Sequence, residues 1–181
     1  MRSTLLKSVV VCAVLALSTG AFAQQPPAGG TPPAGGAPAA PPPPTPYGPS
    51  ITLEKARKAV EAAEAEAKKN NWFMAIAVVS VGGHLVLFNK MDNTQVASIA
   101  IAQHKARTAV NYRRPTKVFQ DALAANPANV YLLTLDDIVA SEGGIPIVED
   151  GKIIGAMGCS GGTSPQDGQT CQAGVNALKG S

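Results

Sequence analysis

Two pairs of apolar runs, each joined by a turn-forming dipeptide, constrain the fold more than any other feature of the sequence. One pair lies within residues 74–88 around Gly82-Gly83, and the other lies within residues 145–157 around Asp150-Gly151. Gly-Gly and Asp-Gly pairs favour the tight turns that join antiparallel strands. The sequence therefore predicts two β-hairpins.

Helical periodicity fills the segments outside the hairpins. Thr52 is a suitable N-cap for the first helix, and Asn70-Asn71 is expected to end it. Pro115 suits the first turn of the third helix, and Ser164 is expected to cap the last. Residues 131–139 contain short apolar pieces that periodicity does not assign. The expected helices cover residues 53–69, 95–112, 116–125 and 165–178.

The order helix, hairpin, two helices, hairpin, helix decides the expected fold class. Consecutive hairpins give antiparallel pairing, whereas a parallel sheet needs a crossover between successive strands. An α+β sandwich, with helices packed on one antiparallel sheet, is therefore expected. In the second helix, periodicity places Val96, Ile99, Ala106 and Val110 on one apolar face.

The two ends of the chain differ in character from the rest. Residues 1–23 have the pattern of a secretory signal peptide, because Arg2 and Lys7 precede a short apolar core that ends in Ala21-Phe22-Ala23. We expect cleavage there, export to the periplasm or the extracellular space, and no transmembrane segment in the mature chain. Residues 24–49, rich in Pro, Ala and Gly and without charge, predict a disordered linker before one domain at residues 50–181.

Charge and cysteine content bear on nucleic-acid binding and on disulfide formation. Loss of two basic residues with the leader leaves 13 basic residues against 12 acidic ones, so nothing in the charge favours nucleic acid. Cys159 and Cys171 remain in the mature chain. In an oxidising compartment they could form a disulfide, but two free buried thiols are equally compatible with the sequence.

Residues 158–162 fit the G-x-S-x-G pattern of a serine hydrolase around Ser160. Both histidines, His84 and His104, precede this serine, whereas the hydrolase order requires a later histidine, so a hydrolase is disfavoured. The glycines stand directly before a helix, where free backbone N–H groups and the helix dipole favour an anion. A carboxylate site and a simple turn remain as alternatives.

A polar patch is expected on the second helix. His104, Arg107, Thr108 and Asn111 share one face at helical spacing. This face is either solvated or a ligand site in which an imidazole binds metal or haem iron and Arg pairs with a carboxylate. His84, after the first turn, is either an exposed turn residue or a ligand. Further positive charge nearby comes from Lys105, Arg113 and Arg114.

Several segments together resemble the GlcG/HbpS haem-binding and haem-degrading family, which is related to the C-terminal domain of PduO-type proteins. The matching segments are Val79–Val86, Lys105–Ala109, Arg113–Thr116, Glu142–Ile147, and Ser160–Thr163 with Asp167. The resemblance covers most of the expected domain. It implies a profilin-like antiparallel sheet with packed helices, assembly into homo-oligomers and, in some members, haem binding.

The resemblance also implies candidate site residues. The Gly-Gly-His turn makes His84 a candidate axial ligand of haem iron, and the Lys-Ala-Arg-Thr segment makes Lys105, Arg107 and Thr108 candidate pocket residues. We expect a secreted haem-binding protein more than an enzyme, with slow haem degradation or iron and oxidative-stress sensing as additional roles. Iron would be bound by His84, or by His104 with Thr108, and haem propionates by Arg107, Arg113 or Arg114.

The alternative expectation is a small-carboxylate module, motivated by the association of family members with glycolate genes. Two glycine-rich loops would bind the anion through their backbone amides. Their residues are Glu142, Gly143, Gly144, Gly161, Gly162 and Thr163.

Overall fold

The computed structural model describes residues 42–179, in which a single antiparallel sheet has the strand order β2-β1-β4-β3. Both predicted hairpins are confirmed, with the first turn at Gly82-Gly83 and the second at Asp150-Gly151. The leader at residues 1–23 and most of the linker lie outside the described residues. The strands are β1 (Ala75–Ser80), β2 (Leu85–Lys90), β3 (Gly144–Glu149) and β4 (Lys152–Ser160).

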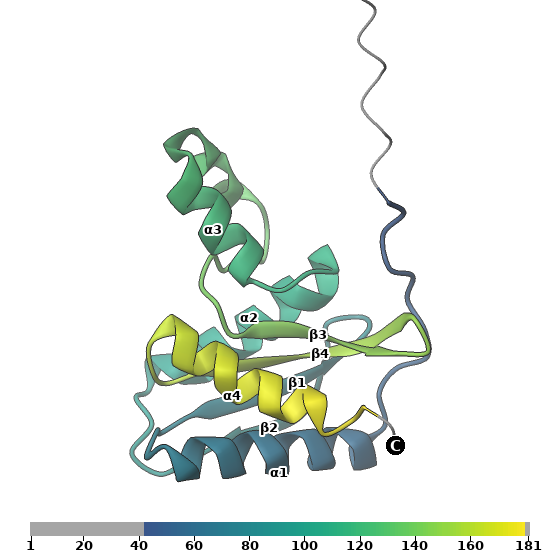
Figure 1. The fold of residues 1–181 in the computed structure, drawn as a ribbon, viewed down its shortest axis with the longest axis vertical. Helices are drawn as coiled ribbons and strands as arrows, with labels where there is room; N and C mark the ends of the chain where they lie inside the picture. The colour runs from purple at the N-terminus through teal and green to yellow at the C-terminus, as the bar shows by residue number, and fades with distance from the viewer. Residues whose placement is uncertain (1–41, 180–181) are drawn as a thin grey trace, which may run out of the picture. The chain divides into compact units, whose positions relative to one another are not determined.

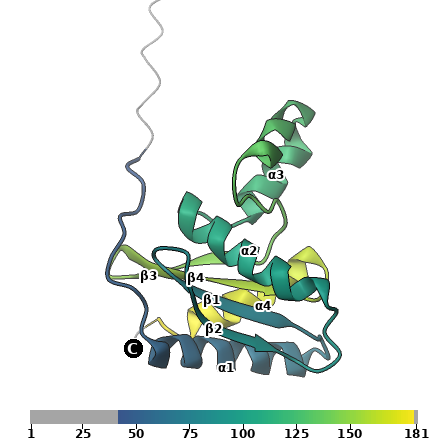
Figure 2. The same ribbon diagram turned by 180° about the vertical axis from the view of Figure 1, so that it is seen from behind.

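Helices cover both faces of the sheet, so the expected α+β sandwich is confirmed. Figure 1 shows α1 and α4 on one face, and Figure 2 shows α2 on the other. Within residues 42–179, no helix combines the length and apolar character needed to cross a membrane. The helices are α1 (Leu53–Lys69), α2 (Ala97–Tyr112), α3 (Lys117–Ala125), the 3-10 helix η1 (Pro127–Thr134) and α4 (Ser164–Asn176).

Alternation along β1 divides the core into two apolar clusters. Ile76 and Val78 pack toward α1 and α4, whereas Ala75, Ala77 and Val79 pack toward α2. The side toward α2 is built from small residues, so the helix approaches the sheet closely. A Cβ atom at Gly158 of β4 would lie only 2.0 Å from the carbonyl oxygen of Ala102.

The expected apolar face of α2 is only partly correct. Ala106 and Val110 are buried, but Val96 is 80 % exposed because it precedes the first helical turn. The buried face instead includes the polar residues Lys105 and Thr108. Periodicity alone cannot reveal them, because their burial depends on hydrogen-bond partners elsewhere in the chain.

The packed domain begins before residue 50. Gly48 N–H donates to the Ile153 carbonyl at 2.8 Å, and Ile153 N–H donates to the Pro46 carbonyl at 2.8 Å. This end of β4 extends beyond β1, whose last residue pairs with Gly155. Residues 46–48 occupy the vacant edge, so the last part of the expected linker belongs to the domain.

A disulfide joins the end of β4 to α4. Cys159 and Cys171 are bonded, with Cα atoms 5.6 Å apart, and both are buried. The expected cap of α4 at Ser164 is wrong by one residue. Thr163 is the N-cap and forms a capping box with Gln166. The Thr163 side chain accepts from the Gln166 backbone N–H, and the Gln166 side chain accepts from the Thr163 backbone N–H.

Candidate functional site

Ser160 cannot serve as a nucleophile in this fold. The residue is 3 % exposed, and its hydroxyl donates to Ser98 Oγ at 3.1 Å. Both histidines, in contrast, are exposed. The G-x-S-x-G pattern is therefore a packing arrangement between β4 and α2.

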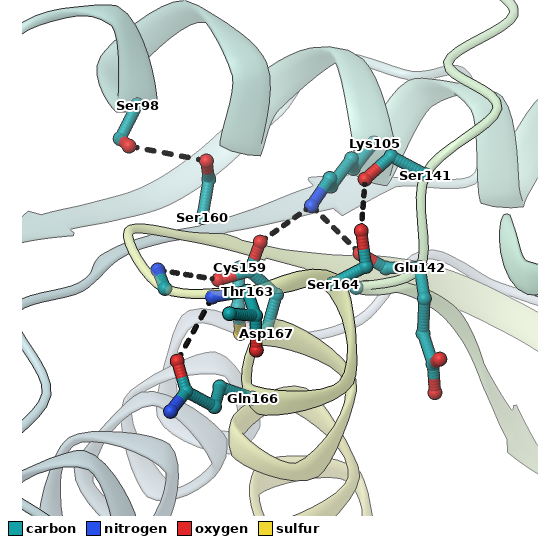
Figure 3. A network of polar contacts seen from close by, with 12 residues as sticks. Ser98, Lys105, Ser141, Glu142, Cys159, Ser160, Thr163, Ser164, Gln166 and Asp167 are labelled. Carbon is teal, nitrogen blue, oxygen red and sulfur yellow. Dashed lines mark hydrogen bonds and ion pairs between the residues drawn. The ribbon is translucent and has the colours of Figure 1, made fainter.

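A buried ion pair connects α2 with α4. Lys105 Nζ donates to Asp167 Oδ2 at 2.7 Å and to the Glu142 carbonyl at 2.7 Å. Figure 3 shows the Lys105 side chain reaching from α2 toward the start of α4. Burial raises the pKa of the Asp167 carboxyl, and the neighbouring Lys105 ammonium opposes that rise only in part. Lys105 is therefore an interior residue in this fold, not a wall of an open pocket.

The same ion pair brings the two glycine-rich loops together. Gly143 has a φ of 121°, and a Cβ atom there would lie 2.8 Å from Asp167 Cβ and 3.0 Å from Lys105 Nζ. Only glycine suits this position, because both the backbone conformation and the space exclude a side chain.

Most of the backbone amides expected to bind an anion donate to partners within the chain. Gly162 N–H donates to Asp167 Oδ1 at 2.9 Å, and Thr163 N–H donates to Gln166 Oε1 at 2.9 Å. Gly144 N–H donates to Thr116 Oγ1 at 2.9 Å. An external carboxylate would have to displace these groups, chiefly the protein's own Asp167.

Thr108 is also an interior residue. Its hydroxyl accepts a hydrogen bond from Val139 N–H at 3.0 Å and lies against the carbonyls of His104 and Asp137. Arg107 Nε contacts Asp137 Oδ1 at 3.3 Å on the partly exposed side of the same helix. The polar face of α2 therefore holds residues 137–139 in place.

The Gly-Gly-His turn packs against this face of α2. A Cβ atom at Gly83 would lie 3.5 Å from Asn111 Oδ1 and 3.7 Å from Arg107 Cγ. The adjacent His84 is exposed. The structure thus brings the His84 turn and Arg107 together, although the two are distant in sequence.

Two more cations follow at the C-terminal end of α2. The guanidinium of Arg113 lies 4.4 Å from the ring centroid of Tyr47, and that of Arg114 lies 5.9 Å from the ring centroid of Phe119. Both arginines are exposed. With Arg107, they place positive charge at the same end of α2 as the His84 turn.

An open pocket of about 410 Å³ lies elsewhere, between the start of β3 and α4. It includes Glu142, Gly143 and Gly144 from one predicted loop, but neither histidine. Sequence reasoning missed its other residues, because they come from separate helices without a shared motif. These are Pro115, Lys117, Ile145, Pro165, Gly168, Gln169 and Gln172.

Comparison with known proteins assigns the family. The protein-family model described as "haem degrading protein HbpS-like" matches residues 51–176 of this chain. The chain belongs to this HbpS-like family. It is similar to the protein GlcG of Escherichia coli K12, with 39 % identity over 110 residues, which cover 61 % of this chain and 81 % of GlcG.

Solved structures of similar fold include a double mutant of Streptomyces reticuli HbpS, with a TM-score of 0.66 and 29 % identity over 73 % of this chain and 89 % of that one. A complex of PduOC with haem has a TM-score of 0.66 and 23 % identity, and the match covers 72 % of this HbpS-like chain and 96 % of PduOC. The latter likeness shows the fold alone.

Proposed function

We propose that the mature chain is an exported haem-binding protein in which His84 contributes an axial ligand to the haem iron. Membership of the HbpS-like family supports the haem, and the leader pattern of residues 1–23 supports export. The observation that carries the assignment to His84 is the packing of its turn against α2 beside Arg107.

The chemistry of these residues fits a haem bound at the surface. An exposed imidazole is accessible to iron, and guanidinium groups donate charge-assisted hydrogen bonds to carboxylates such as the haem propionates. Arg107 and its partner Asp137 have side chains that are 28 % and 40 % exposed. Such a surface pair is weak, so a propionate could replace Asp137 at little cost.

The alternative ligation by His104 with Thr108 has less support. The Thr108 hydroxyl is fully buried and is bonded to residues 137–139 and to the helix backbone. Its use as a ligand would require these residues to move. When bound, haem would supply a redox-active iron. We propose haem binding as the main function, with slow haem degradation or sensing as additional roles.

A visible absorption titration of residues 24–181 with ferric haem tests the proposal. We expect a saturable, shifted Soret band that is lost in His84→Ala and retained in His104→Ala. His104 is the matched control, because it is also an exposed histidine. A band indistinguishable from that of haem with a non-binding protein would overturn haem binding. Equal binding by both variants would overturn the assignment of His84.

We also propose that the protein forms homo-oligomers through α3 and η1. These helices extend away from the sheet in both ribbon views (Figures 1 and 2). Sedimentation velocity should show a shift toward monomer when Tyr131 and Leu133 are replaced together by Ser. An unchanged sedimentation coefficient would contradict this interface. The exposed apolar residues of this segment are Val118, Val130, Tyr131, Leu133 and Leu135.

A further inference from the structure

The 410 Å³ pocket is lined in part by Glu142, whose backbone is held from two sides. Glu142 N–H donates to Gln120 Oε1 at 2.9 Å, and its carbonyl accepts from Lys105 Nζ at 2.7 Å. The Glu142 side chain points away from Lys105 (Figure 3). Within residues 42–179, its carboxylate makes no hydrogen bond or ion pair. The carboxylate is thus positioned but has no direct partner.

Gly168 provides the space for this carboxylate. A Cβ atom at Gly168 would lie 2.4 Å from Glu142 Oε1 and 2.7 Å from its Cδ. Glycine in a helix is less favourable than alanine, because it loses more backbone entropy on folding. A side chain at Gly168 would have to displace the end of the Glu142 side chain from this position.

The other polar groups of the pocket add hydrogen-bond acceptors. Gln169 Nε2 donates to Glu66 Oε1 at 2.7 Å, and Gln172 Nε2 donates to Asn176 Oδ1 at 2.9 Å. Each of these amide groups keeps its carbonyl oxygen as an acceptor, along with a second N–H donor. The pocket therefore combines the Glu142 carboxylate with two neutral amide groups.

The positive charge at the pocket rim is already paired. Lys117 Nζ lies 2.8 Å and 2.9 Å from the two carboxylate oxygens of Asp121. The pKa of Lys117 is raised mainly by this hydrogen bond, and Glu142 contributes less. The charges of Lys117 and Asp121 cancel, so the Glu142 carboxylate leaves the site net negative toward a cationic ligand. The remaining walls include apolar surface from Pro115, Ile145 and Pro165.

We propose that this pocket binds a small organic cation that carries N–H donors on an alkyl body, such as an alkylammonium or alkylguanidinium ion. The cationic head would pair with Glu142 and donate to the oxygens of Gln169 and Gln172. The alkyl body would lie against the proline and isoleucine surface. This site is separate from the proposed haem site and does not depend on it, because it contains neither histidine.

Calorimetric titration of residues 24–181 with butylammonium tests the proposal, with butanol and butyrate as neutral and anionic analogues. We expect saturable binding of butylammonium alone. Glu142→Gln should weaken it by about tenfold, since the charge-assisted hydrogen bond becomes a neutral one and the ion pair is lost. Glu61→Gln is the matched control, because Glu61 is an exposed glutamate on α1.

Two results would overturn the proposal: no saturable heat with butylammonium at millimolar concentration, or equal binding by wild type and Glu142→Gln. Thermal melting verifies that the variants are folded. If Glu142→Gln does not fold, NMR titration of the wild type decides the matter. Butylammonium must then shift the side-chain amide signals of Gln169 and Gln172 more than butanol does. Haem titration should be unchanged in Glu142→Gln, which separates this site from the haem proposal.

Discussion

Lys105 on α2 and Asp167 on α4 form an ion pair across 2.7 Å, and both side chains are almost completely buried. A buried charge that loses its partner retains the cost of its desolvation. We therefore expect Lys105→Met to lower the free energy of unfolding by about 3–5 kcal/mol. Urea denaturation measures the change.

The exposed Lys69 provides a matched control for this substitution. Lys69→Met should change the free energy of unfolding by less than about 0.5 kcal/mol, as is usual for surface substitutions. The double variant Lys105→Met with Asp167→Leu should recover much of the loss, because no unpaired charge remains. A double variant no more stable than Lys105→Met would contradict this explanation.

The raised pKa of Asp167 predicts a specific pH dependence. Because burial raises the folded-state pKa of Asp167 above its ordinary value, the folded state binds the proton more tightly than the unfolded state. The contribution of Asp167 to stability should therefore rise as pH falls through its folded-state pKa, be fully present below its ordinary unfolded-state pKa, and be lost as pH rises through the folded-state pKa. The free energies of unfolding of the wild type and of Asp167→Asn should be measured from neutral pH downward. We expect the wild type to gain stability relative to the variant as pH falls. A flat difference would refute this pH dependence.

The disulfide between Cys159 and Cys171 should be a stabilising and protected bond. It closes a loop with a sequence separation of 12 residues. The double variant Cys159→Ser with Cys171→Ser should lose about 2–4 kcal/mol of stability, because the unfolded chain is no longer constrained. Thiol titration of the denatured, unreduced mature protein should detect no free thiol, and two thiols would disprove the bond.

Glycolate should not stabilise the folded protein through the two glycine-rich loops. The Gly162 and Thr163 amides already donate to Asp167 and Gln166. A ligand that binds only the folded state must raise the melting temperature. We expect no rise with glycolate beyond that given by chloride. A glycolate-specific rise that disappears in Gly162→Ala would revive the carboxylate hypothesis.

Local signals in the sequence were sufficient for the elements of the fold. The Asp150-Gly151 turn has φ angles of 48° and 71°, the conformation that this dipeptide favours. Thr52 caps α1 as expected, with its side chain accepting from Lys55 N–H at 3.3 Å. Turns and caps depend on residues a few positions apart, so a single sequence is enough to predict them.

The sites, in contrast, were decided by tertiary structure. In the sequence, Lys105 is one of several cations on a polar helix face. Its partner Asp167 lies 62 residues away in the chain, so local spacing does not indicate the ion pair. Likewise, the Glu142 carboxylate occupies the space above Gly168, which belongs to a different element. The sequence by itself determined the hairpins, the helices and the family resemblance. Only the packing of α2 and α4 around the sheet decided which charges are buried, because desolvation and pairing depend on neighbours in space.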